Sequence, residues 1–439
     1  MRRWAERRPS RSRPGWRRCS WLAGSWRVPA ARAAAVGLCA ALLAGCGSAG
    51  GARPGASGTG GAGVTSGAWR ADTSGTQQRL YAVACLSALR CEAVGAAGTI
   101  VSTGDGGATW RAQANPLQGS ATILYRIACV PPGSCYVIAR PDTILVTHDG
   151  GATWSSHVLP LAGAGANLTD RQCPPEPSVW PPVPALCRLG LLDIACVSAR
   201  ICYAVATGPA GYSYVPISGP GWRPAGPPSS IWMSSDGGTS WARQSVPPGV
   251  GCEGGDCWKE LFNYPLEWIS CLGSGLCRAG GGYFGGGGNS GYVYAVVAVT
   301  RPGAPWTMLT CPGDFPCFRK ELASHARGGP FAPDAGVCPT SARCYGVHST
   351  SNGVYWSADG GELWLAGSSG ASSLRIAIAC PAAQICYTAG NQGTITRTVN
   401  GTAFAADGRP TSHDLYGITC AAAAICYAVG DNGTIVARR

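Results

Sequence analysis

The sequence predicts an all-β protein, a seven-bladed β-propeller, and three observations lead to this prediction. Cysteine pairs with five intervening residues occur seven times along the chain. Four short apolar segments repeat around these pairs, at spacings of 40 to 44 residues where no insertion intervenes. The strand missing from the last repeat is found ahead of the first one. Repetition of a four-stranded unit is typical of propeller blades, whereas a β-sandwich does not repeat in this way.

The individual strands can be placed in the two fullest repeats. These read LYAVACLSALRCEAVGAAGTIVSTGDGGATW from Leu80 and LYRIACVPPGSCYVIARPDTILVTHDGGATW from Leu124. Each has a strand that ends at the first cysteine, a strand that starts at the second, a third around Gly-Thr-Ile, and a fourth led by tryptophan. The 65 glycines, 33 prolines and 13% of charged residues also favour short strands and tight turns over helices.

The cysteine pairs predict one disulfide in the first hairpin of each blade. Residues that face each other across such a hairpin come close enough to bond, and closing a ring of about seven residues contributes roughly 2 kcal/mol. Zinc binding is the competing interpretation, but zinc ligands favour shorter spacings and the five histidines are scattered. Disulfides require an oxidising compartment. The predicted pairs are Cys85/Cys91, Cys129/Cys135, Cys196/Cys202, Cys271/Cys277, Cys338/Cys344, Cys380/Cys386 and Cys420/Cys426, with Cys173/Cys187, Cys252/Cys257 and Cys311/Cys317 in insertions.

The ends of the chain predict how the ring closes. The last repeat stops at Arg439 after its third strand. Ala68 to Asp72 read AWRAD, which matches the tryptophan-led fourth strands TWRAQ and SWARQ elsewhere. Pairing this N-terminal strand into the last blade would leave no free sheet edge at the junction.

The N-terminus predicts export and a lipid anchor. Residues 1–45 combine an arginine-rich stretch with an apolar run too short to span a bilayer, which is typical of a signal peptide. Leu-Ala-Gly-Cys at 43–46 resembles a bacterial lipobox, which implies that Cys46 is lipidated; the alternative is an ordinary cysteine at the end of the signal. Residues 46–67 predict a flexible Gly/Ser/Ala-rich tether, and 68–439 the propeller. We therefore expect a monomer outside the cytoplasm, held at the membrane only by its lipid and otherwise secreted.

The charge distribution argues against a nucleic-acid partner. The net charge is +12, but ten of the 34 basic residues and one of the 22 acidic residues lie in the first 45 positions. The remaining chain carries 24 basic and 21 acidic residues, so the folded part is close to neutral.

Four repeats carry a turn in which Ser or Thr is followed by any residue, Asp-Gly-Gly, two more residues and Trp. Its aspartate is expected to accept backbone N–H bonds and its tryptophan to pack on the neighbouring blade, so we interpret the turn as structural. This turn resembles the Asp-box, or BNR repeat, of sialidases and other exported propellers. The Asp-box residues are Asp105 and Trp110, Asp149 and Trp154, Asp236 and Trp241, and Asp359 and Trp364.

Together with CYAVGDNGTI from Cys426 and CYTAGNQGTI from Cys386, these turns resemble the photosystem II stability/assembly factor family of seven-bladed propellers over about Trp69 to Arg439. The resemblance implies a scaffold or binding role, with no cofactor and no metal. The cysteine hairpins and the lipobox depart from that family.

The insertions indicate where a partner binds. The first-to-second and third-to-fourth strand loops of a propeller share one face, which here carries the short cysteine hairpins and Asp-boxes. The long insertions, 155–190, 208–230, 242–266, 280–291 and 307–336, fall on the other face. Long stapled loops with aromatic residues suit a protein or polysaccharide partner; alternatively, the aromatics only cap one another. The candidates are Trp180, Tyr212, Tyr214, Trp222, Trp258, Phe262, Tyr264, Tyr283 and Phe284.

An enzyme is the alternative to a binding scaffold. A sialidase has six blades and an Arg motif in its first blade, and that motif is absent around Arg79 and Arg90. A glycosidase that uses two carboxylates remains open, although the loop acids Asp170, Glu176, Glu253, Asp256 and Glu260 form no pattern. We therefore predict no catalytic residues, and we expect carboxylates to converge at the mouth of the central channel if the protein is an enzyme.

Overall fold

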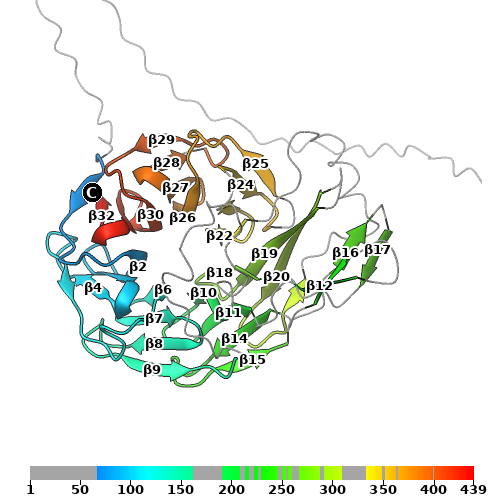
Figure 1. Ribbon diagram of the computed structural model, residues 1–439, viewed down its shortest axis with the longest axis horizontal. Helices are drawn as coiled ribbons and strands as arrows, with labels where there is room; N and C mark the ends of the chain where they lie inside the picture. Colours follow the sequence, from blue (N-terminus) through cyan, green and yellow to red (C-terminus); the bar gives the residue numbers. More distant parts are fainter. Residues whose placement is uncertain are drawn as a thin grey trace, which may run out of the picture. The chain divides into compact units, whose positions relative to one another are not determined.

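Short antiparallel strands arranged around a central axis make up the folded part of the chain (Figure 1). The computed structural model describes residues 67–161, 190–207, 213–216, 222–225, 229–245, 250–253, 256–259, 266–286, 291–308, 333–348, 352–361, 364–398 and 400–439. These residues all belong to one compact unit, Val64–Arg439. They contain seven four-stranded sheets and two separate hairpins. The predicted all-β propeller is confirmed.

Three sheets come from the first half of the described chain. The first contains β2 (Leu80–Cys85), β3 (Cys91–Gly95), β4 (Ile100–Thr103) and β5 (Arg111–Ala112). The second contains β6 (Leu124–Val130), β7 (Ser134–Ala139), β8 (Thr143–Thr147) and β9 (Ser155–Val158). The third contains β10 (Gly190–Cys196), β11 (Cys202–Thr207), β14 (Ser230–Ser234) and β15 (Ala242–Gln244).

Four more sheets complete the unit. The fourth contains β18 (Trp268–Cys271), β19 (Cys277–Gly286), β20 (Gly291–Thr300) and β21 (Thr307–Met308). The fifth contains β22 (Ala335–Val337), β23 (Cys344–Val347), β24 (Val354–Ser357) and β25 (Leu365–Gly367). The sixth contains β26 (Arg375–Ala382), β27 (Ile385–Gly390), β28 (Ile395–Thr398) and β29 (Ala405–Gly408). The last combines β30 (Leu415–Ala422), β31 (Ile425–Gly430) and β32 (Ile435–Arg438) with β1 (Arg70–Asp72).

The ring follows from contacts between the first strands of successive sheets. β2, β6, β10, β18, β22, β26 and β30 contact one another in this order, and β30 also contacts β2. Within the first sheet, every residue of the second strand β3 is buried, whereas both residues of the fourth strand β5 are exposed. Apolar side chains from adjacent sheets form the core between them, as where Val94 of the first sheet clusters with Leu124 and Val137 of the second.

The N-terminal strand closes the ring as predicted. Arg70 pairs with Ala437 and Asp72 with Ile435, which places β1 outside β32 as the fourth strand of the last sheet. Trp69, just before β1, is buried with its ring 6.0 Å from that of Tyr387 in the sixth sheet.

A shared carboxylate reinforces this closure. The indole N–H of Trp69 and the guanidinium of Arg438 both donate to Asp407 Oδ2, each at 2.7 Å. Asp407 belongs to β29 of the sixth sheet, so it joins the two paired strands of the last sheet to their neighbour.

The predicted Cys-x5-Cys disulfides are present. In the first sheet Cys85 and Cys91 are register partners and are bonded, with their Cα atoms 3.9 Å apart. The other six bonds are Cys129–Cys135, Cys196–Cys202, Cys271–Cys277, Cys338–Cys344, Cys380–Cys386 and Cys420–Cys426. Each joins the first two strands of one sheet.

The insertions differ in detail from the predicted ranges. Ser155–Val158, Ala242–Gln244 and Thr307–Met308 form fourth strands, because the segment after each tryptophan still pairs with the third strand. The glycine-rich range 280–291 lengthens a hairpin, since β19 and β20 pair from Cys277 to Gly286.

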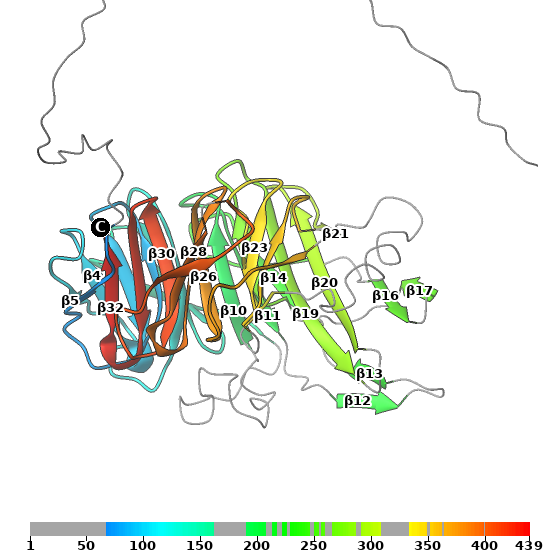
Figure 2. The same cartoon turned by 90° about the horizontal axis from the view of Figure 1, so that it is seen from above.

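Two small hairpins lie within insertions 208–230 and 242–266, away from the main sheets (Figure 2). One pairs β12 (Ser213–Pro216) with β13 (Trp222–Ala225), and the second pairs β16 (Val250–Glu253) with β17 (Asp256–Lys259). No helix that could span a bilayer occurs among the residues that the structure describes.

Candidate functional site

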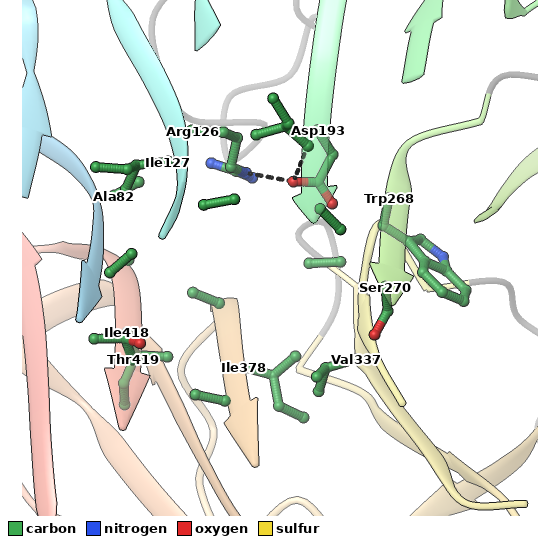
Figure 3. Close-up of a pocket in the computed structure, with 18 of the residues that line it drawn as sticks. Ala82, Arg126, Ile127, Asp193, Trp268, Ser270, Val337, Ile378, Ile418 and Thr419 are labelled. Carbon is green, nitrogen blue, oxygen red and sulfur yellow. Dashed lines mark hydrogen bonds and ion pairs between the residues drawn. The ribbon is translucent and has the colours of Figure 1, made fainter. Parts of the chain in front are cut away.

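The axis of the ring contains a cavity of about 410 Å³. Its wall is formed by the first strands of all seven sheets, so residues from far apart in the sequence meet there (Figure 3). One end lies where these strands begin, on the face that carries the insertions; we call this end the mouth. The other end lies at the disulfides.

The cavity exists because most first strands present small residues to the axis. Three residues before the first cysteine of each pair, four sheets have alanine or glycine at the wall; these are Ala82, Ala335, Ala377 and Gly417. The same position in the other three sheets holds Arg126, Asp193 and Trp268. Trp268 is only 1% exposed and its ring lies 6.1 Å from that of Trp364, so it fills the space between two sheets. Polar side chains therefore project from one side of the wall.

Asp193 is the most tightly held of these polar side chains. Its Oδ2 accepts the backbone N–H of Ile269 in the next sheet at 2.8 Å, and its Oδ1 accepts that of Ile194 at 3.0 Å. Burial raises the pKa of Asp193 to about 6, and nearby Arg126 and the backbone N–H groups oppose this rise. The carboxylate thus joins two sheets and still titrates near neutral pH.

Arg126 faces Asp193 across the wall, as Figure 3 shows. Its Nε lies 3.9 Å from Asp193 Oδ1, at the outer limit of an ion pair. Its guanidinium lies over the ring of Tyr125, 4.1 Å from the centroid, and Arg140 lies 3.8 Å from the same centroid. Cation–π contacts with a partly buried ring fix both guanidiniums in place.

Tyrosines and carboxylates complete the mouth. Tyr81 and Tyr416 are buried with ring centroids 5.9 Å apart, and the phenol of Tyr416 donates to Asp431 at 3.0 Å. Glu267 and Asp334 line the cavity one and two sheets beyond Asp193, and Asp334 lies 3.6 Å from His348 Nε2. The mouth is therefore aromatic and basic on one side and carboxylate-rich on the other.

The Asp-box aspartates are placed in turns rather than at this cavity. Asp105 accepts the backbone N–H of Thr109 at 2.9 Å and its hydroxyl at 2.7 Å, and these bonds hold the pKa of Asp105 down at about 2. Gly107 has φ of +85°, which lets its N–H donate to Thr103. Trp110 lies 5.8 Å from the ring of Tyr427 in the preceding sheet.

The other Asp-boxes follow the same pattern of contacts. Asp149 and Asp236 make the equivalent bonds, and Asp359 accepts the hydroxyl of Ser357. Trp154, Trp241 and Trp364 pack on the core between their sheet and the preceding one.

The aromatic binding candidates are only partly covered by the structure. Trp180, Tyr212, Phe262 and Tyr264 lie outside the described residues. Tyr214, Trp222 and Trp258 lie on the hairpin strands β12, β13 and β17, and Tyr283 and Phe284 lie on the outer part of β19. Their role in binding stays a prediction.

The predicted lipidation site and the predicted disulfides of the insertions lie wholly or partly outside the residues that the structure describes. Cys46 is outside the described residues, as are Cys173, Cys187, Cys311 and Cys317. Cys252 and Cys257 are register partners in the β16–β17 hairpin.

The polar residues of the cavity wall were missed by reasoning from the sequence, which considered only acids of the insertions. A signal was available: when the repeats are aligned on their cysteines, Arg126 and Asp193 replace the alanine or glycine of most copies. No group of metal-ligating side chains occurs in the part of the chain that the structure describes.

Comparison with known proteins supports the propeller fold. The family model of the photosynthesis system II assembly factor YCF48 matches residues 62–169. A solved structure described as YCF48 bound to D1 peptide is similar, with 14% identity and a TM-score of 0.53, covering 84% of this chain and 94% of that chain. YCF48 from Cyanidioschyzon merolae has 15% identity and a TM-score of 0.52, covering 85% and 98%.

A streptogramin B lyase structure is as similar in shape, with 10% identity and a TM-score of 0.53, covering 84% of this chain and 97% of that chain. No curated protein sequence matches the chain. Likeness at such low identity extends to the fold alone, since one fold carries many functions.

Proposed function

We propose that the chain is a seven-bladed scaffold that binds a protein partner through the face around the channel mouth. The observation that carries this proposal is the cavity, which opens among fixed charged and aromatic groups on the same face as the insertions. A concave site with a few oriented polar groups is the usual form of a binding site. The partial match to the assembly-factor family and the similar structure with a bound peptide favour a protein segment over a small metabolite.

We further propose that this scaffold works outside the cytoplasm, tethered by a lipid on Cys46. The Leu-Ala-Gly-Cys sequence at the end of the predicted signal and the seven disulfides support this location. Mass spectrometry of the mature protein from its native envelope tests it: an acylated N-terminal Cys46 is expected, and a mature chain that begins elsewhere would refute the anchor.

Partner binding is tested by crosslinking in the native envelope, followed by capture with variants. Asp193→Asn alters the mouth, and Trp222→Ala alters an insertion on the same face. Arg200→Gln, on an exposed cysteine-hairpin loop of the opposite face, is the matched control. We expect the first two to lose the crosslinked protein and the control to retain it. Trp222→Ala should keep the parent melting temperature, whereas Asp193→Asn should stay folded but melt lower, because it loses one of the bonds that Asp193 accepts. Equal capture by all three would refute binding at the mouth, and capture of a polysaccharide instead would refute a protein partner.

A carboxylate-based glycosidase is the second candidate, and one observation favours it. Asp193, Glu267 and Asp334 line the mouth, and the pKa of Asp193 is raised to about 6, as a general acid requires. Hydrolysis of a panel of aryl glycosides, abolished by Asp193→Asn and by Glu267→Gln and declining above pH 6 in the parent protein, would establish it. Complete lack of turnover over the panel would leave the mouth as a binding surface.

A further inference from the structure

The chain enters the ring on the disulfide face. β1 is antiparallel to β32, and β32 runs from the mouth face towards the Asp-box turns, so β1 begins at the Asp-box side. Gly67, ahead of β1, packs against the backbone carbonyl of Arg439. The guanidinium of Arg439 in turn donates to Gly106 O at 3.0 Å, in the first Asp-box turn. Gly67 and Arg439 therefore lie together on the face opposite the mouth.

The two faces of the ring also differ in how far their loops protrude. The disulfide face is built from seven hairpin loops of five residues each and from short Asp-box turns. The opposite face carries the β12–β13 hairpin and the long β19–β20 hairpin (Figure 2). The chain therefore enters the ring on the flatter of the two faces.

We infer that the propeller stands on its membrane with the disulfide face towards the bilayer, so that the mouth and its insertions point away from it. This inference rests on the proposed lipid anchor at Cys46. Only 21 residues, 46–66, lie between the proposed lipid and Gly67, where the chain joins this face. A short tether fixed to one face brings that face close to the surface.

The orientation restricts the partner. The first strands are about six residues long, so the mouth lies roughly 20 Å farther from the bilayer than the disulfide loops do. A partner that binds at the mouth must reach it from the side away from the membrane. The ring should therefore bind an extended segment or a soluble domain, and not a stretch that remains at the bilayer surface.

Energy transfer to labelled lipids tests the orientation. The sequence has two lysines, Lys259 and Lys320. In the test protein both are replaced by arginine and the α-amine is acetylated. A single newly introduced lysine then carries the donor dye. Ala424→Lys places the dye on an exposed disulfide-face loop of the last sheet, and Ser412→Lys places it on an exposed mouth-face loop beside the same sheet. A histidine tag takes the place of residue 46 and holds the chain on vesicles with nickel-chelating lipids and acceptor-labelled lipids.

We expect at least about twofold greater transfer from the dye at 424 than from the dye at 412, given a height difference of about 20 Å. Moving the tag to follow Arg439 should preserve this order, because Arg439 lies on the same face as Gly67. Equal transfer, or greater transfer from position 412, would overturn the inference. Because the tag supplies the tether, the outcome does not depend on acylation: a native protein that lacks the lipid refutes the anchor, whereas these transfer values test the face.

Discussion

Replacing Glu92 should stabilise the protein at alkaline pH. Glu92 follows Cys91 on β3 and is 3% exposed, and its Oε2 has no hydrogen-bond partner among the residues that the structure describes. It lies beneath the Asp-box turn of the second sheet, where a Cβ on Gly151 would come within 2.9 Å of Oε1. The equivalent position is a buried tyrosine in five sheets and Arg278 in another, the tyrosines being Tyr136, Tyr203, Tyr345, Tyr387 and Tyr427. Glu92 thus puts a carboxyl where most sheets place a ring.

The size of this stabilisation follows from the protonation of Glu92 in the folded and the unfolded chain. Burial raises the pKa of Glu92 from 4.5 to about 8, although the positive charge of Arg90 opposes the rise. Below pH 4.5 the carboxyl is protonated in the folded and the unfolded chain alike. Between pH 4.5 and 8 only the unfolded chain ionises, which costs about 1.4 kcal/mol of stability per pH unit, or at most about 5 kcal/mol by pH 8. Stability tied to this group is therefore present below pH 4.5 and lost as the pH rises to 8.

The assay is denaturant unfolding with intact disulfides at intervals from pH 5 to pH 9. Glu92→Gln should match the parent protein at about pH 5 and exceed it increasingly up to pH 8, by as much as about 5 kcal/mol. Arg90→Gln supplies the control in the opposite direction, because removing its charge should raise the pKa of Glu92 further and extend the loss of stability to higher pH. Parallel pH profiles for the parent and Glu92→Gln would refute the reasoning.

Three further predictions concern the stability of the ring. Asp407→Ala should cost about 2 to 4 kcal/mol in denaturant unfolding, because it leaves Trp69 and the buried guanidinium of Arg438 without their shared acceptor; a change within 0.5 kcal/mol would count against this role. Cys85→Ala with Cys91→Ala should lower the free energy of unfolding by about 2 kcal/mol, and an unaltered denaturation midpoint would contradict it. Three Asp-box carboxylates have lowered pKa values, so their contribution should be lost as pH falls from about 4 towards 2; an acid titration of near-ultraviolet circular dichroism without a change in this range would disprove it.

The repeated features of the fold could be predicted from the sequence because they depend on local pattern. Cys85 and Cys91 are register partners because a five-residue loop between two strands allows little else. The closing strand could be found because Trp69 occupies the position of Trp110 in an otherwise matching segment.

The cavity wall was harder to predict because it depends on which side of each first strand faces the axis. That side is set by all seven sheets together, so Asp193 and Arg126 stand out only when the repeats are aligned on their cysteines, and not in the sequence around either residue alone. Glu92 was missed for a related reason: a carboxylate on a strand is ordinarily assigned to the surface, and its burial appears only once the second sheet packs over it. The glycine-rich segment 280–291 was predicted to be an insertion, yet residues 280–286 pair with β20 and extend β19.

Ring closure has a mechanical consequence. The described disulfides each bond two strands of one sheet, whereas β1 is held to β32 by hydrogen bonds and packing. Any force applied through the segment before Gly67 acts first on β1, at the end where Arg70 pairs with Ala437. Such a pull would peel β1 away one pair at a time, while the bonded strands of each sheet resist. The bonds of Trp69 and Arg438 to Asp407 lie at this loaded end, where they oppose the first step of peeling.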